Sequence, residues 1–119
     1  MTSVVNVKVA HIRPQYHNLQ DWIRDTNNVY IGRMGVVFID KVRFPKEGSI
    51  WANPFKIGKD GDRDQVLAKY KTYIMEKLEN NTLIQNELDN LEGKQLGCWC
   101  YPEKCHGDVL VDIIQNRQH

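Results

Sequence analysis

The chain has 119 residues, 41% of them hydrophobic, and its 16 Lys and Arg residues nearly balance 15 Asp and Glu residues. This length and apolar content suit one folded domain, residues 1–119, and exclude a wholly disordered chain. The net charge of +1 does not favour nucleic acid as the main partner, because gripping phosphate backbones needs many uncompensated cations. No apolar run approaches the roughly 18 residues of a membrane span, so no membrane association is expected.

Targeting and cysteine patterns predict a cytoplasmic protein. The first residues show no basic region followed by an apolar one, which is the pattern of a secretory signal. The three cysteines lie in one short stretch, and an odd number in one place is not a disulfide framework. Both features favour a reducing compartment.

The first part of the chain predicts strands around one short helix. Residues 5–9 alternate valine with polar side chains, which indicates a strand. Residues 18–25 place Leu, Trp and Ile at helical spacing. The segments 29–33 and 35–40 are apolar and rich in β-branched and aromatic residues, so both are expected to be strands.

A long irregular loop is expected next, followed by a helix. Proline and glycine interrupt residues 49–63, and loops of this length in small domains usually carry function. Asp62 or Asp64 is suited to cap the helix that follows. Apolar residues at helical spacing over 66–78 predict the helix face that packs on the core.

The last part of the chain predicts two more helices around a strand. Thr82 and Gln85 fit a capping box, and Gly93 is a plausible left-handed end for that helix. Residues 94–99 predict a short strand, and 106–115 repeat apolar residues at helical spacing.

Strands that alternate with helices predict an α/β fold. We expect a small single-domain three-layer sandwich with a mostly parallel sheet, loosely Rossmann-like. In such sheets, ligands bind beyond the carboxyl ends of the strands. The ends of the strands at 29–33 and 94–99, and the loop between them in sequence, are therefore the expected location of a site.

Four soft or borderline metal donors lie within nine residues, namely Cys98, Cys100, Cys105 and His106. In one interpretation these residues bind zinc, or three thiolates hold an iron–sulfur cluster. In a second, Cys105 is a reactive thiolate beside His106, which Asp108 orients, so that these three residues are the catalytic candidates. In a third, the cysteines are small buried hydrophobes and His106 bonds the backbone.

A second group of residues suits an anionic ligand. Arg33 follows a Gly at a strand end, and Arg63 lies near a helix start, where anions are favoured. Ser49, Trp51 and Asn53 in the loop between them are further ligand-binding candidates. An aromatic side chain in a loop, such as that of Trp51, can stack on a base. The alternative is that both arginines brace loops and the aromatic residues pin the loop to the core.

Four motifs in this order resemble those of the uncharacterised family called domain of unknown function 4326. They are YIGR at 30–33, GSIWANPF at 48–55, GDRDQVLAKY at 61–70 and LEGKQLGCWCYPEKCHGDVL at 91–110. The resemblance covers about residues 28–114 and leaves a strand and a short helix, within 1–27, mostly outside it. It implies that the family's motif positions are Arg33, Ser49, Asn53, Pro54, Arg63, Cys98, Cys100, Cys105, His106 and Asp108.

The resemblance transfers no reaction, because the family itself has no established function. The family occurs in phages, large DNA viruses, bacteria and some eukaryotes, so a phage or viral origin and the host cytoplasm are plausible. We expect a nucleotide-like or phosphorylated small molecule at one end of the sheet, next to the Cys/His cluster. The alternative is a non-enzymatic phage or viral interaction protein in which that cluster is only structural.

Overall fold

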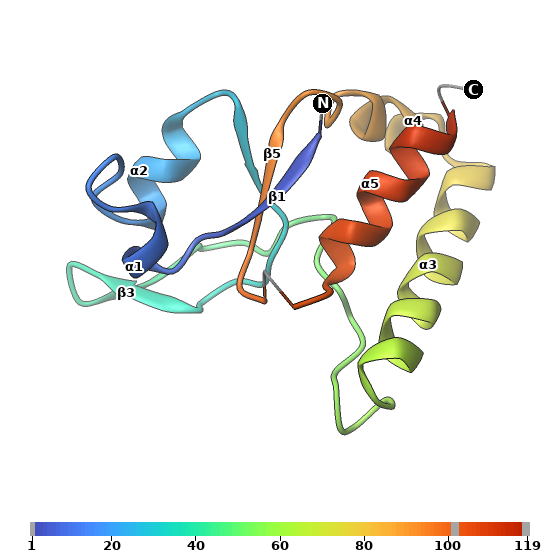
Figure 1. Cartoon of the computed structure of the whole chain (residues 1–119), viewed down its shortest axis with the longest axis horizontal. Coiled ribbons are helices and arrows are strands. Elements are labelled where there is room, and N and C mark those ends of the chain that lie inside the picture. The colour runs from blue at the N-terminus through green and yellow to red at the C-terminus, as the bar shows by residue number, and fades with distance from the viewer. Residues whose placement is uncertain (1, 101–102, 118–119) are drawn as a thin grey trace.

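A parallel sheet of three strands forms the centre of the computed structural model, which describes residues 2–100 and 103–117 (Figure 1). The strand order is β1 (Ser3–Asn6), β5 (Gln95–Cys98) and β2 (Asn28–Tyr30), with β5 in the middle. Gln95 is in register with Ser3 on one side and with Asn28 on the other. The carboxyl ends of all three strands therefore lie at one edge of the sheet.

One face of the sheet is covered by helices from the second half of the chain. These are α3 (Arg63–Asn80), α4 (Thr82–Asp89) and α5 (His106–Arg117), which Figure 1 shows to the right of the sheet. The first turn of α5 lies close to the sheet, since a Cβ on Gly107 would lie 3.0 Å from Cδ1 of Ile31. A glycine at this position thus lets the start of α5 approach the ends of the strands.

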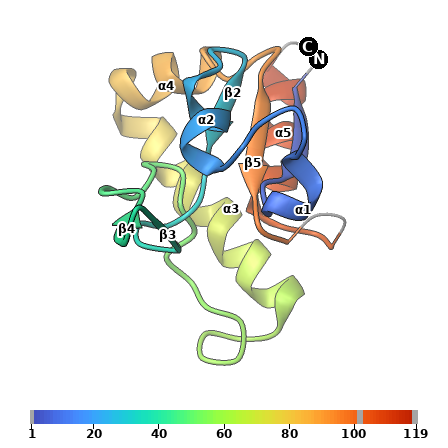
Figure 2. The same ribbon diagram turned by 90° about the vertical axis from the view of Figure 1, so that its left-hand side faces the viewer.

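The opposite face carries α1 (Val9–Ile12), α2 (Leu19–Arg24) and an antiparallel hairpin. The hairpin pairs β3 (Val37–Ile39) with β4 (Val42–Phe44) and lies below α1 in Figure 1. Figure 2, seen from that side, shows the hairpin on the left and α1 on the right. Helices on both faces of a parallel sheet make the α/β three-layer arrangement that the sequence predicts.

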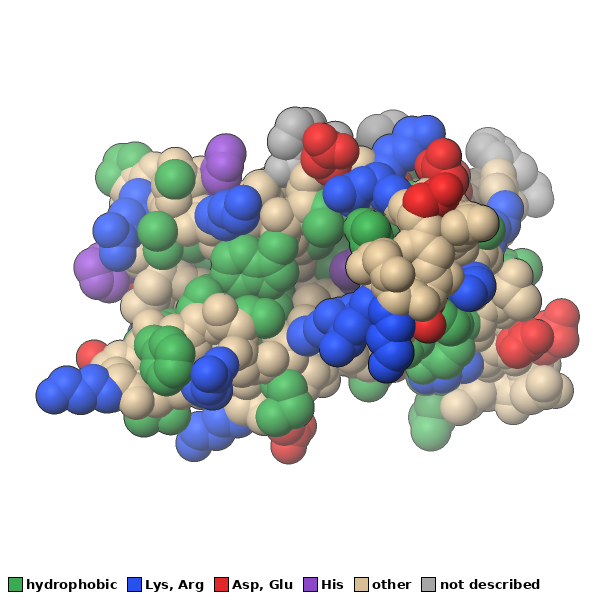
Figure 3. All heavy atoms as spheres, turned by 90° about the horizontal axis from the view of Figure 1, so that it is seen from below, with side chains coloured by type: hydrophobic (Ala, Val, Ile, Leu, Met, Phe, Trp, Pro, Cys, Tyr) green, Lys and Arg blue, Asp and Glu red, His purple; other side chains and the backbone are tan. Residues whose placement is uncertain are grey.

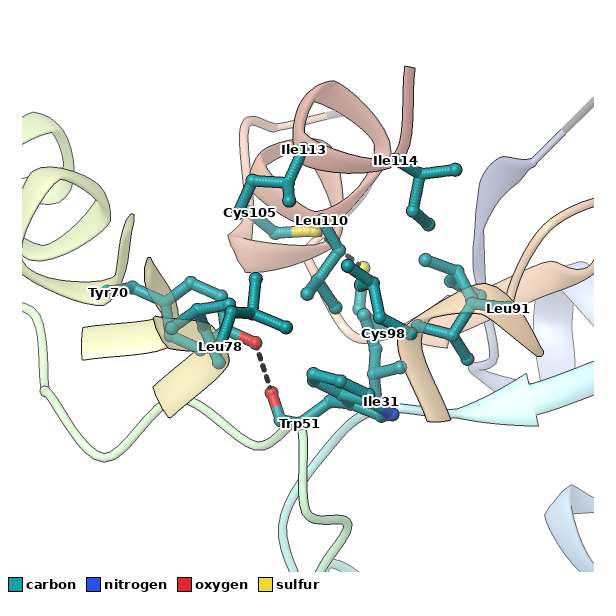
Figure 4. Packing of buried hydrophobic residues seen from close by; sticks show 13 residues of the cluster. Ile31, Trp51, Tyr70, Leu78, Leu91, Cys98, Cys105, Leu110, Ile113 and Ile114 are labelled. Atoms are coloured by element: carbon teal, nitrogen blue, oxygen red, sulfur yellow. Dashed lines mark hydrogen bonds between the residues drawn. The ribbon is translucent and has the colours of Figure 1, made fainter. Parts of the chain in front are cut away.

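The core is divided between the two faces. Figure 4 shows the larger half, in which side chains from α3 and α5 meet those of β5 and the long loop. Tyr70 of α3 is fully buried, and its hydroxyl donates to the carbonyl of Trp51, 2.6 Å away. Because Trp51 is only 3% exposed, this bond fastens the loop before Arg63 to the core.

Several predicted boundaries differ from the structure. The first strand ends at Asn6, whose side chain accepts from the Lys8 backbone N–H, and Val9 begins α1 instead of ending a strand. The capping box at Thr82 is wrong, because Asn81 caps α4 by accepting from the two backbone N–H groups that follow Thr82. Of the two predicted caps for α3, Asp62 and Asp64, the structure shows Asp62, which forms a capping box with Gln65.

Candidate functional site

A pocket of about 480 Å³ lies at the carboxyl ends of β2 and β5. The residues that follow β2 form one wall, and those that follow β5 form the next. The long loop and the first turns of α3 and α5 close the remaining sides. The lining residues are Gly32, Arg33, Val36, Asn53, Phe55, Lys56, Ile57, Arg63, Val66, Leu67, Cys98, Trp99, Cys100, Lys104, Cys105 and His106.

The charged residues of this lining are all basic. Arg33, Lys56, Arg63 and Lys104 come from four separate segments, and none of the lining residues that the structure describes is Asp or Glu. Figure 3 views this face of the molecule and shows Lys and Arg side chains beside hydrophobic ones around its centre. Arg63 forms an ion pair with Glu103, whose side chain is 69% exposed and whose carboxylate lies 3.8 Å from Nε of Arg63. The pocket therefore has a positive character although the chain is nearly neutral.

Both predicted arginines brace loops as well as line the pocket. Arg33 donates from Nε and Nη2 to the carbonyl of Asn53, at 3.3 and 3.0 Å, and from Nη2 to the carbonyl of Phe55. Arg63 donates from Nη1 to the carbonyl of Lys104, 2.7 Å away. The ligand-binding and loop-bracing interpretations of these residues are thus compatible.

The other predicted ligand residues divide between the pocket and the core. Asn53 lines the pocket, and its side-chain oxygen accepts from the backbone N–H of Phe55, which shapes the loop. Ser49 and Trp51 are not among the lining residues. The hydroxyl of Ser49 accepts from the backbone N–H of Trp51, and the Trp51 indole is packed in the core.

All three cysteines line the pocket, and two of them are in contact. The sulfurs of Cys98, at the end of β5, and Cys105, just before α5, are 3.1 Å apart, and both residues are buried. Figure 4 shows these sulfurs facing each other between α5 and the sheet. The contact with Cys98 and burial raise the pKa of the Cys105 thiol well above its usual range, although the Gly107 N–H opposes this. At neutral pH the sulfur of Cys105 is therefore a protonated thiol.

His106 and Asp108 each form a hydrogen bond with the backbone. Nε2–H of His106 donates to the carbonyl of Ile31 at 2.6 Å, and the ring lies edge-on to Tyr70. Burial lowers the pKa of His106, so its ring is neutral at pH 7. The Asp108 carboxylate accepts from the backbone N–H of Cys105, 2.9 Å away, and so caps α5. Catalysis by Cys105, His106 and Asp108 stays a prediction.

The predicted metal donors are only partly assembled. Cys98 and Cys105 meet, whereas Nε2 of His106 is turned to a carbonyl and Cys100 is half-buried. Within residues 2–100 and 103–117, no three His, Cys, Asp or Glu side chains form a group suited to a metal ion. Binding of zinc or of an iron–sulfur cluster stays a prediction.

Sequence reasoning missed the two lysines and several apolar residues of the lining. Lys56 directly follows the Asn-Pro-Phe motif, and Lys104 directly precedes Cys105. Their positions beside motif residues are the signal that could have found them. Trp99 lies between two predicted cysteine ligands and lines the pocket as well.

The geometry defines a small α/β protein with a basic pocket at the carboxyl edge of a parallel sheet. A family model described as "Domain of unknown function (DUF4326)" matches residues 15–116, and the chain belongs to this family. The predicted family resemblance is thereby confirmed. Among the helices described by the structure, none has the length and apolar character that crossing a membrane requires.

The chain is also similar to a phage protein, the "Uncharacterized 12.4 kDa protein in nrdA-td intergenic region" of Enterobacteria phage T4. The two are 32% identical over 68 residues, which is 56% of this chain and 61% of the phage protein. No solved structure matches the chain.

Proposed function

We propose that the pocket binds a small organic anion of the nucleotide type, with a phosphate at its basic end and a flat base against its apolar wall. The observation that carries this proposal is the lining itself. Four basic side chains and no described carboxylate surround one hollow at the carboxyl ends of parallel strands, where α/β proteins bind ligands.

The side chains, more than the helix N–H groups, supply the affinity for an anion. Asp62 already accepts from the Gln65 N–H in the first turn of α3, and Asp108 accepts from the Cys105 N–H just before α5. The two helix dipoles still add positive potential, because both helices begin at the pocket. Arg33 and Arg63 each keep part of the guanidinium fork beyond the bonds that brace the loops, and such forks suit phosphate.

The apolar part of the lining suits a base or a similar flat group. Phe55, Val66, Leu67 and Trp99 lie on the same pocket as the cations. A volume of about 480 Å³ is within the range of roughly 300–1,000 Å³ that small-molecule sites have. A phosphate alone would leave this apolar surface unused.

The thiols adjoin the proposed ligand but do not define a reaction. Cys98, Cys100 and Cys105 line the same pocket as the basic side chains. Cys105 is held as a protonated thiol, which is a weak nucleophile. The proposal is therefore one of binding, and a catalytic step would need a change in the environment of this thiol.

The test is calorimetric titration with adenosine 5′-monophosphate, adenosine and inorganic phosphate. We expect the monophosphate to bind more tightly than either of its parts. Lys56→Ala removes a pocket charge and leaves intact the bond from the Lys56 backbone N–H to Asp60. It should weaken monophosphate binding about fivefold, the equivalent of ~1 kcal/mol for a partly screened ion pair.

The matched control is Lys71→Ala, which removes an exposed charge from α3 away from the pocket. It should leave binding unchanged. Equal binding of adenosine and its monophosphate, or equal losses in the two variants, would contradict the proposal.

A further inference from the structure

A second hollow lies beside the first on the same edge of the sheet. It has a volume of about 620 Å³ and is enclosed by α1, the start of α2 and β3. Its lining includes Lys8, Arg13 and His17, with Asp40 as the acidic residue among those described. Like the first pocket, it combines basic side chains with apolar ones.

Trp99 joins the two hollows, because it lines both of them. Its ring lies edge-on to Tyr30, with the ring centroids 6.4 Å apart, and its Nε1–H donates to the Tyr30 hydroxyl at 2.9 Å. That hydroxyl donates in turn to the carbonyl of Arg33. These bonds hold a half-buried indole in a fixed orientation between the two hollows.

Basic side chains line both hollows. Arg33 and Arg63 lie on one side of Trp99, and Lys8 and Arg13 lie on the other. Nε of Arg13 donates to the carbonyl of His17, 2.7 Å away, which anchors that guanidinium at the rim. An aromatic ring between two basic ends is the pattern that binds a base and its flanking phosphates.

We propose that the two hollows form one groove for two or more linked nucleotides, in which one base stacks on Trp99 and phosphates lie at both ends. This inference rests on the proposed function, since it extends the ligand of the first pocket into the second. The shared chemistry has two sources, a free dinucleotide and the end of a single nucleic-acid strand. Because the net charge of the chain is only +1, the basic side chains of the groove must supply most of the attraction for the phosphates.

The experiment is a titration of the full chain with thymidine 5′-monophosphate and with oligothymidylates of two, four and eight units. Tryptophan fluorescence is a suitable readout, because Trp22 and Trp51 are buried and Trp99 lines the groove. We expect Kd to fall about tenfold from the monophosphate to the dinucleotide, as one more stacked base contributes. If the natural ligand is a free dinucleotide, we expect no further fall in Kd beyond two units. If it is the end of a strand, we expect Kd to fall again at four units.

Variants locate the groove. Lys8→Ala should weaken binding of the tetranucleotide more than that of the monophosphate, and should reduce the slope of log Kd against log salt concentration by about 0.7 for one lost phosphate contact. Trp99→Phe should reduce the gain with length. Lys71→Ala is the matched control, and melting curves show whether each variant is folded.

The outcomes separate the two proposals. Monophosphate binding with no gain in longer ligands overturns the groove and keeps the proposed function. A gain with length that Lys8→Ala and Trp99→Phe leave intact also overturns the groove. If no thymidine nucleotide of any length binds, the groove is overturned, and the titration with adenosine 5′-monophosphate decides the proposed function by itself.

Discussion

Replacing Tyr70 with phenylalanine tests how the long loop is held at the pocket. The Tyr70 hydroxyl donates to the Trp51 carbonyl at 2.6 Å, and both residues are buried. Tyr70→Phe would leave that carbonyl without its donor, which costs about 1–3 kcal/mol. The unfolding entropy of a 119-residue domain is about 0.25 kcal/mol per K, so Tm should fall by about 4–12 °C.

The assay is thermal unfolding followed by circular dichroism, with Tyr73→Phe as the control. Tyr73 lies on the same helix, and its ring contacts with Phe55 and Lys77 need no hydroxyl. Its replacement should change stability by less than about 0.5 kcal/mol. Equal melting temperatures for the two variants would refute the account of the loop. Because the loop continues into the pocket, Tyr70→Phe should also weaken nucleotide binding.

Three further predictions concern packing, pH and thiol reactivity. Gly97→Ala would place a Cβ 2.5 Å from the Trp22 ring. It should lower the free energy of unfolding, measured by denaturant melts, by about 1–3 kcal/mol. An unchanged free energy of unfolding would contradict the close packing of Gly97 against Trp22. Burial lowers the pKa of His106, so on acidification the unfolded chain binds a proton at this residue before the folded chain does. The free energy of unfolding should therefore be at its full value above about pH 6.5. Below that pH it should fall by at most ~1.4 kcal/mol per pH unit. His106→Asn should remove this dependence below about pH 6.5, and an unchanged slope would contradict it. With an aromatic disulfide reagent at pH 7, the half-buried Cys100 should react first and the buried Cys105 slowly. Two fast-reacting thiols in the native protein would contradict the burial of Cys98 and Cys105.

The elements that sequence predicted best are those with a strong local signal. The helix after the long loop has a regular apolar stripe and an aspartate cap, and it is α3 with Asp62 as its cap. Gly93 has a positive φ of 79°, but it lies in the turn after α4, which ends at Asp89 with Asn90 as its C-cap, so the prediction that Gly93 ends this helix is wrong. The short helix α1 and the strand β4 lack such signals. A helix of one turn and a strand of three residues are too short for a periodic pattern, and they form through tertiary contacts.

The site shows the same division between local pattern and tertiary geometry. The strand-end and loop motifs at Arg33, Asn53 and Arg63 do meet at one pocket, since parallel strands share one carboxyl edge. Trp51 packs in the core instead. Side chains along an irregular loop do not alternate regularly between the core and the solvent, so the sequence cannot predict that direction. The bond from His106 to the Ile31 carbonyl depends on how α5 packs against the sheet, which its neighbours in sequence do not specify.

The most direct test of the account is an amide NMR titration of the protein with adenosine 5′-monophosphate. We predict saturable shifts that cluster at the pocket, on Gly32, Lys56, Cys98 and the start of α5 near Cys105, and that Lys56→Ala weakens. Shifts confined to surfaces away from these residues, or none at millimolar ligand, would contradict a nucleotide-type site at the end of the sheet.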